Sequence, residues 1–169
     1  MARNNGHRIP DREAYRRRLE DFLNNPPSKI IQDAASIQLD NHFAKYACVL
    51  VSGYLETSIK ELLFNYSQLK SEDRISRYIG KAWPQSMNMN STNITDIVGK
   101  FDPVWETEIK DWLGSGVQSN RSVIDGIIKT RNNIAHGQES KTTGVSINSV
   151  SKQFSTAKGL VEKLEGLVR

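Results

Sequence analysis

Residues 41–69 carry the feature that most constrains the fold, because apolar side chains cover almost the whole circumference of one predicted helix. Their apolar positions recur at spacings of three and four, the period of an α-helix. The broad face consists of Ala44, Ala47, Cys48, Val51, Leu55, Ile59, Leu62, Leu63 and Tyr66. A second patch consists of Val49, Leu50, Tyr54 and Phe64. A helix with so little polar surface is predicted to lie at the centre of a helical bundle.

Shorter helices are expected on both sides of this central helix. An N-terminal helix is expected over 11–24, because Asp11 can cap its start and two prolines follow its end. Residues 28–39 form either a separate helix or an extension of the central one. The less periodic region 71–116 is expected to hold short helices over 72–79, 94–101 and 104–113. A closing helix is expected over 147–168, and the sum is an all-α bundle with a looser, loop-rich middle.

The length of 169 residues and the hydrophobic fraction of 37% suit one domain with one core. We divide the chain into a basic N-terminal helix with a Pro-Pro linker, residues 1–27, packed on a helical domain, residues 28–169. No apolar leader precedes residue 23, and the apolar run 47–51 is far shorter than the roughly 18–20 residues of a membrane span. We therefore expect a cytoplasmic protein with no membrane contact. The single cysteine, Cys48, is expected to be a small buried residue.

The net charge of +4 and the isoelectric point near 9.2 suit a polyanionic partner without requiring one. Much of the positive charge lies near the N-terminus, on Arg3, Arg8, Arg12, Arg16, Arg17 and Arg18. Two interpretations stay open for this stretch: an ordinary solvated helix face, or a contact with nucleic acid.

Several kinds of site lack the residues that they need. The histidines His7, His42 and His136 have no carboxylate or thiol at metal-ligand spacing, so no metal site is expected. The glycines form neither GxGxxG nor GxxxxGK[ST], and there is no serine nucleophile elbow. We therefore expect no bound cofactor, and we disfavour nucleotide-binding folds and serine hydrolases.

The strongest candidate for chemistry is residues 130–137, which end a helix expected to begin near Asn120. At about 100° per residue, Arg131 falls on the apolar face of this helix, where a charge needs a partner or nearby water. Asn132 and His136 lie four residues apart and therefore on the same side of the helix, one turn from each other. Gly137 can adopt the left-handed conformation that commonly ends a helix, which leaves His136 at the last turn.

Glu56 interrupts the apolar surface of the central helix, and two interpretations of it are weighed equally. It is either an edge carboxylate near solvent, paired with Lys60 four residues later, or the acceptor for Arg131. The second interpretation explains two misplaced charges on two apolar helices at once.

The segment Arg131-Asn132-Asn133-Ile134-Ala135-His136 resembles the R-x(4–6)-H motif of the HEPN superfamily, in which a polar residue is favoured directly after the arginine. The segment from Val51 to Glu56 is similar to the small-aromatic-Leu-Glu stretch of the long central helix of that superfamily. The resemblance covers roughly residues 41–168, with a loose match over 71–116. It is greatest to two HEPN groups, the RiboL-PSP group among them.

This resemblance implies a helical homodimer in which two copies of Arg131 and His136 face each other across one cleft. Such a cleft often acts as a metal-independent endoribonuclease, with the RNA 2′-hydroxyl as nucleophile. The resemblance then assigns acid–base roles to His136, phosphate binding to Arg131, an orienting or donating role to Asn132 and a supporting role to Glu56. The expected products carry a 2′,3′-cyclic phosphate and a 5′-hydroxyl.

The cellular role implied is that of a toxin or an anti-phage defence effector, with RNA and a cognate antitoxin or defence-system protein as partners. An alternative from another class is a non-catalytic HEPN module for dimerisation and for binding RNA or protein. In that case His136 would only favour the helix dipole and Arg131 would form a structural ion pair. Some HEPN toxins carry a modifiable tyrosine two residues after the histidine; Gln138 stands there, so that regulation is not expected.

Overall fold

The computed structural model describes residues 11–29, 34–84 and 87–169, and of residues 34–37 and 139 the backbone alone. Within these ranges the chain forms seven α-helices and two short 3-10 helices, with no strand. The predicted all-α bundle is therefore confirmed. None of the helices in these ranges is long and apolar enough to cross a membrane.

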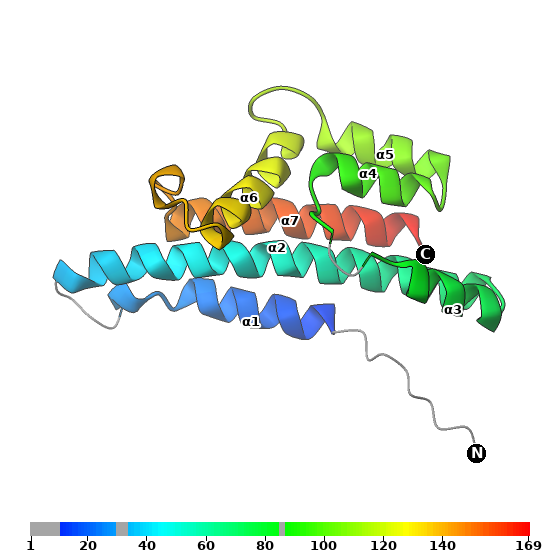
Figure 1. Cartoon of the computed structure of the whole chain (residues 1–169), viewed down its shortest axis with the longest axis horizontal. Coiled ribbons are helices and arrows are strands. Elements are labelled where there is room, and N and C mark those ends of the chain that lie inside the picture. Colours follow the sequence, from blue (N-terminus) through cyan, green and yellow to red (C-terminus); the bar gives the residue numbers. More distant parts are fainter. Residues whose placement is uncertain (1–10, 30–33, 85–86) are drawn as a thin grey trace, which may run out of the picture.

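The longest helix, α2 (Ala34–Lys70), forms the axis of the bundle, and α1, α3, α6 and α7 all pack against it (Figure 1). It includes the predicted central helix 41–69. It also begins earlier, so the second half of the segment 28–39 belongs to it. Residues Pro27–Lys29 form a separate 3-10 turn, and residues 30–33 lie outside the described ranges.

The other helices are α1 (Arg12–Asn24), α3 (Asp73–Ala82), α4 (Ser91–Gly99), α5 (Pro103–Leu113), α6 (Asn120–Ala135) and α7 (Ile147–Leu167). They match the predicted ranges to within one or two residues at each end, with two exceptions. Helix α4 begins three residues before the predicted range 94–101, because Asn90 caps its start, and α3 extends three residues beyond the predicted range 72–79. The Asp11 carboxylate accepts hydrogen bonds from the first turn of α1, and Asp102 does the same before Pro103 of α5. The Ser146 hydroxyl opens α7 with a reciprocal capping box.

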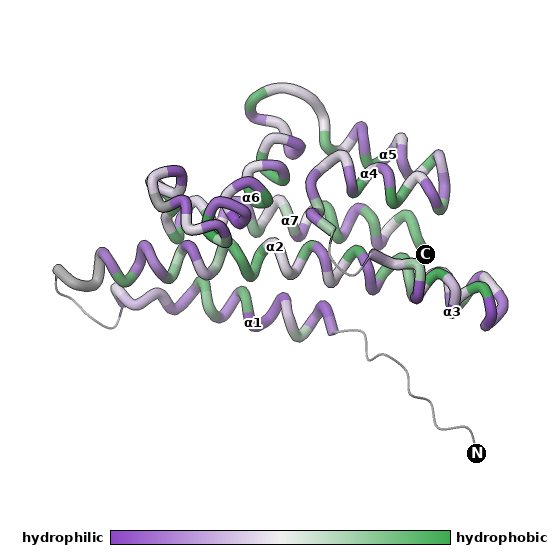
Figure 2. Tube along the Cα trace, in the orientation of Figure 1, coloured by the Kyte–Doolittle hydropathy of each residue, from purple (hydrophilic) through white to green (hydrophobic). Residues whose placement is uncertain are grey.

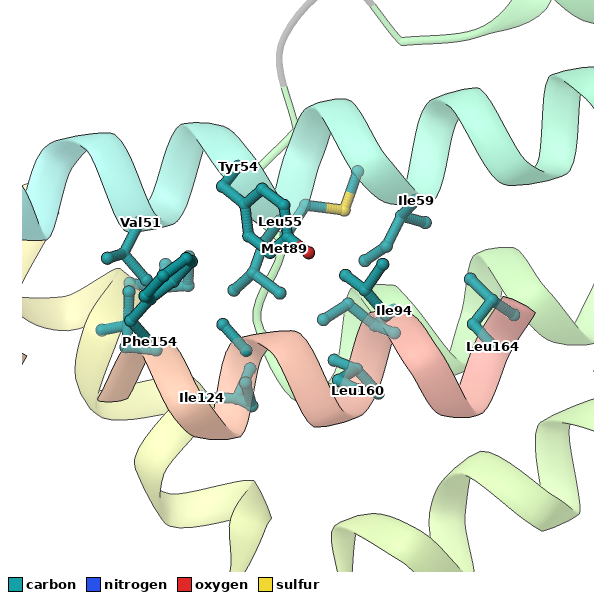
Figure 3. Close-up of a cluster of buried hydrophobic side chains, with 14 of the residues drawn as sticks. Val51, Tyr54, Leu55, Ile59, Met89, Ile94, Ile124, Phe154, Leu160 and Leu164 are labelled. Carbon is teal, nitrogen blue, oxygen red and sulfur yellow. The ribbon is translucent and has the colours of Figure 1, made fainter. Parts of the chain in front are cut away.

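The core lies between α2 and α7, with further side chains from α4 and α6 (Figure 3). Tyr54 and Leu55 of α2 face Phe154 and Leu160 of α7 across this layer. Ile94 of α4 fills the same layer, so the middle region contributes to the core although its sequence is less periodic. Helix α1 also belongs to the core, through Leu19 and Leu23.

Candidate functional site

Helix α6 positions the predicted motif, and its N-terminal three turns are anchored in the core. The Ser119 hydroxyl accepts a hydrogen bond from the Ser122 backbone and begins the helix. Ile124 and Ile127 have no exposed surface. The Cys48 thiol donates to the Ile127 carbonyl oxygen at 3.8 Å, which places this turn of α6 directly on α2. The motif therefore begins, at Arg131, one turn after the contact between Ile127 and Cys48.

A second attachment of α6 comes from Asp125, which sequence analysis did not select. Its carboxylate accepts hydrogen bonds from the Ser91 backbone N–H at 2.7 Å and from the Ser91 hydroxyl at 2.9 Å. Arg121, one turn earlier, donates to the same hydroxyl and to the Gly114 carbonyl oxygen. Asp125 thus binds the N-terminal end of α4, where the helix dipole favours a negative charge. The only sequence signal was a carboxylate among apolar neighbours on α6.

Arg131 continues the stripe of Ile124, Ile127 and Ile128, but the structure leaves it half-buried rather than in the middle of the core. Its guanidinium donates to the Asn132 side-chain oxygen at 3.0 Å. This bond orients two adjacent side chains of the motif relative to each other. Four of the five N–H donors that an arginine carries have no acceptor among the described residues, so the guanidinium can bind a further anion.

His136 is the C-cap of α6, and its side chain is exposed. Its backbone N–H donates to the Asn132 carbonyl oxygen at 3.0 Å, so the two predicted site residues lie one turn apart as their spacing indicated. Gly137 has φ +64°, and hydrogen bonds from Gly137 to Ile134 and from Gln138 to Asn133 complete a Schellman motif. The predicted left-handed stop after His136 is confirmed.

Glu56 and Arg131 do not form the ion pair that one interpretation predicted. Among the described residues, neither Arg131 nor Lys60 makes a hydrogen bond or salt bridge with Glu56. The reason is the position of Glu56 on α2. Gly53, three residues earlier, lies against Tyr15 of α1, so closely that a Cβ atom there would be 2.5 Å from the Tyr15 hydroxyl. Residues three apart share one side of a helix, so Glu56 lies on the side of α2 that faces α1. Glu56 is half-buried.

The loop after His136 borders a hollow of about 480 Å³ on the surface. Asn41 and Lys45 of α2 line one side, and residues 140 and 142–145 line the other. Figure 2 shows the end of α6 and this loop mainly in hydrophilic colours. The sequence alone does not indicate this hollow, because the approach of α2 to the loop depends on tertiary packing.

Two of the four described arginines near the N-terminus, Arg12 and Arg16, are paired with carboxylates of the protein. Arg12 donates to Glu165 of α7 at 2.9 Å, and its backbone N–H donates to Glu61 of α2 at 2.9 Å. Arg16 forms salt bridges with Glu13 and Glu20. These contacts favour the structural interpretation for Arg12 and Arg16, whereas Arg17 and Arg18 are exposed and form no salt bridge with the described residues. Arg3 and Arg8 lie outside the described residues.

Cys48 is buried, as predicted, and burial raises the pKa of its thiol to about 11. The thiolate that a nucleophile or a metal ligand requires is therefore strongly disfavoured. In the described part of the chain, no group of three or more histidine, cysteine or carboxylate side chains is placed to hold a metal ion.

Comparison with known proteins adds one finding to this geometry. The family model described as RiboL-PSP-HEPN matches residues 11–169, a range that includes α1 as well as the motif of α6. No curated protein and no solved structure matches the chain significantly.

Proposed function

We propose that this chain, which belongs to the RiboL-PSP-HEPN family, is a metal-independent endoribonuclease that acts as a homodimer. The observation that carries the proposal is the arrangement at the end of α6. An exposed histidine lies one turn from a hydrogen-bonded arginine–asparagine pair, where the helix leaves the core. A purely structural helix end has no need for this combination of polar groups.

The reaction needs only the groups that this arrangement offers. The RNA 2′-oxygen attacks the adjacent phosphorus and gives its proton to one His136. The bond from phosphorus to the 5′-oxygen breaks, and that oxygen takes a proton from a second histidine, which leaves a 2′,3′-cyclic phosphate and a 5′-hydroxyl. Histidine suits both roles, because imidazole changes its protonation state near neutral pH.

Arg131 stabilises the negative charge that develops on the phosphoryl oxygens, with two parallel hydrogen bonds from its guanidinium. Asn132 holds this guanidinium through the 3.0 Å bond and leaves its amide N–H groups for a phosphoryl oxygen. The two residues thus form a phosphate-binding pair.

A homodimer supplies the second histidine. The described chain contributes one exposed histidine to this helix end, whereas the reaction transfers two protons in opposite directions. Two copies of α6 meeting across a two-fold axis bring the acid and the base together. Glu56 keeps in this proposal the supporting role that the family resemblance gives it, as a half-buried acidic residue that forms no salt bridge within the described chain.

In the cell we propose a cytoplasmic toxin or anti-phage effector that degrades RNA and is restrained by an antitoxin or defence-system protein. Such an enzyme damages its own host, and a separate partner would then control it.

The test incubates purified protein with mixed RNA in EDTA. Wild-type protein is expected to give fragments with 2′,3′-cyclic phosphate ends, and His136→Ala is expected to lose about 10²–10⁴-fold in rate, the usual contribution of a general acid or base. The matched control is His42→Ala, which removes another exposed histidine and is expected to cleave normally.

Equal rates for wild type and His136→Ala would refute the catalytic proposal. RNA binding without any cleavage would instead support the alternative, a non-catalytic binding module. Light scattering tests the dimer, and a monomer at working concentration would contradict the shared cleft.

A further inference from the structure

Helix α3 presents a stripe of exposed cationic side chains around one exposed aromatic side chain. Arg74, Arg77, Tyr78 and Lys81 are all exposed, and Tyr78 keeps 71% of its surface accessible. Their spacings of three and four residues place them on one face of the helix. Tyr78 lies one turn from Arg74 on one side and from Lys81 on the other. The stripe is therefore continuous along the helix.

The opposite face of α3 is fixed to α2, which determines where the stripe points. The Ser76 hydroxyl donates to the Ser67 carbonyl oxygen of α2 at 3.0 Å. Gly80 lies so close to Phe64 that a Cβ atom there would be 2.7 Å from the ring. Ser76 and Gly80 are four residues apart and lie opposite the stripe. The cations consequently face solvent in a fixed orientation.

The cations of this stripe have no carboxylate partner among the described residues. Within the described ranges, Arg74, Arg77 and Lys81 form no salt bridge, and their side chains make no hydrogen bond. Elsewhere, Arg12, Arg16, Lys110, Lys158, Lys163 and Arg169 are paired with carboxylates. Unpaired exposed cations on one helix face attract a polyanion.

We propose that this face of α3 binds single-stranded RNA, with phosphates on Arg74, Arg77 and Lys81 and a base stacked on Tyr78. The inference rests on the proposed ribonuclease function for the choice of RNA. Arginine matches the geometry of phosphate with two hydrogen bonds, and an exposed aromatic ring stacks on a base of any sequence. An aromatic ring between cations one turn apart suits the alternation of bases and phosphates better than it suits an acidic protein surface.

The α3 contact lies far from the motif of α6. Helix α6 meets α2 at Cys48 and α3 meets it at Ser67, which are separated by about 28 Å along α2 at 1.5 Å per residue. Figure 1 shows α3 at one end of α2 and the loop after α6 near the other end. The stripe therefore supplies affinity for long RNA and takes no part in bond cleavage.

The test measures binding of a fluorescent 20-nucleotide RNA with 2′-O-methyl groups, which cannot be cleaved because its nucleophile is blocked. The variant is Arg74→Gln/Arg77→Gln/Lys81→Gln. The matched control, Lys100→Gln/Lys110→Gln/Arg169→Gln, loses the same net charge from exposed positions elsewhere. Fluorescence anisotropy over a salt series gives the dissociation constants and their salt dependence.

The α3 variant is expected to bind at least about tenfold more weakly than the control at moderate salt. Its plot of log affinity against log salt is expected to be less steep by about 2, from roughly 0.7 per lost phosphate contact. Tyr78→Ala is expected to weaken binding by about 5- to 100-fold without changing the slope, since stacking involves no counterions.

Equal binding by the α3 variant and the control, or no binding by wild type, would overturn the inference. Unchanged RNA binding with loss of an acidic protein partner would assign the stripe to that partner instead. The outcome is separate from the proposed function, because the probe does not depend on cleavage. If wild-type protein cleaves RNA but the α3 variant and the control bind the probe equally, this inference alone is refuted. If His136→Ala cleaves RNA as fast as wild type, the catalytic proposal alone is refuted.

Discussion

Replacing Asp125 by alanine is expected to lower the free energy of unfolding by about 2–4 kcal/mol, although Asp125 lies outside the motif. The carboxylate joins α6 to the first turn of α4 through two hydrogen bonds to Ser91, of 2.7 and 2.9 Å. Ser91 itself is only 1% exposed, so water cannot easily replace the lost acceptor at its backbone N–H.

The magnitude follows from the number and kind of these bonds. A hydrogen bond to a charged group contributes about 1.5–3 kcal/mol. Both bonds to Asp125 are lost, but the Ser91 hydroxyl can rotate its proton toward another acceptor, whereas the backbone N–H cannot, so the hydroxyl bond costs less. The favourable interaction of a carboxylate with the N-terminus of α4 adds about 0.3–1 kcal/mol. The sum lies near 2–4 kcal/mol.

Urea unfolding followed by circular dichroism measures this change, and two further variants test its origin. Ser91→Ala removes the hydroxyl bonds to two charged side chains, Asp125 and Arg121, and is expected to cost about 1.5–3 kcal/mol. The double variant is expected to cost about 1 kcal/mol less than the sum of the two single variants, because they share one hydrogen bond. A loss below about 0.5 kcal/mol for Asp125→Ala, or additive losses, would refute the reasoning.

Three further predictions concern Glu20, Cys48 and Gly137. The Lys158 ammonium is hydrogen-bonded to Glu20 at 3.0 Å and lowers the pKa of the Glu20 carboxyl. The pair therefore stabilises the protein fully above the unfolded-state pKa of Glu20. This stability is lost as the pH falls through the lower folded-state pKa. Glu20→Gln is expected to lower the free energy of unfolding by no more than about 1 kcal/mol near neutral pH and not at all in strong acid. Urea unfolding at both pH values measures this, and an equal loss at the two pH values would contradict the pairing as its cause. Burial raises the pKa of the Cys48 thiol to about 11, so Cys48 is expected to react with a thiol reagent only when the protein opens. If the folded protein reacted as fast as the protein unfolded in urea, the thiol would be accessible in the folded state. Gly137 has φ +64° and open space around it, so Gly137→Ala is expected to lower the free energy of unfolding by about 1–2 kcal/mol through backbone strain alone. An unchanged melting temperature would contradict this and show that the helix end shifts to a relaxed conformation.

The helices themselves could be predicted from the sequence, because their signals are local. Asp11 and Pro103 mark the beginnings of α1 and α5, and Gly137 marks the end of α6, through bonds within a few residues of each cap. The apolar circumference of residues 41–69 was enough to place that helix at the centre. The predicted start of this helix at residue 41 was too late, since residues 34–40 also belong to it.

The partners of polar side chains could not be predicted, because they depend on which faces of distant helices meet. Sequence spacing placed Glu56 and Arg131 on apolar helices and made a pair attractive. In the structure, Glu56 lies on the side of α2 that faces α1, and Arg131 bonds to its neighbour Asn132. The same limitation hid the bond between Asp125 and Ser91, which are 34 residues apart.

The sequence by itself thus determined the all-α class, the helix ends and the grouping of Arg131, Asn132 and His136 at one helix terminus, since hydrogen bonds and side-chain periodicity over a few residues decide all three. Only the tertiary structure decided that His136 is exposed while Arg131 is half-buried, and that the α3 cations have no internal carboxylate. The physical reason is that exposure and pairing depend on how whole helices pack, and the angle at which α6 crosses α2 is set by the complete core rather than by either helix alone.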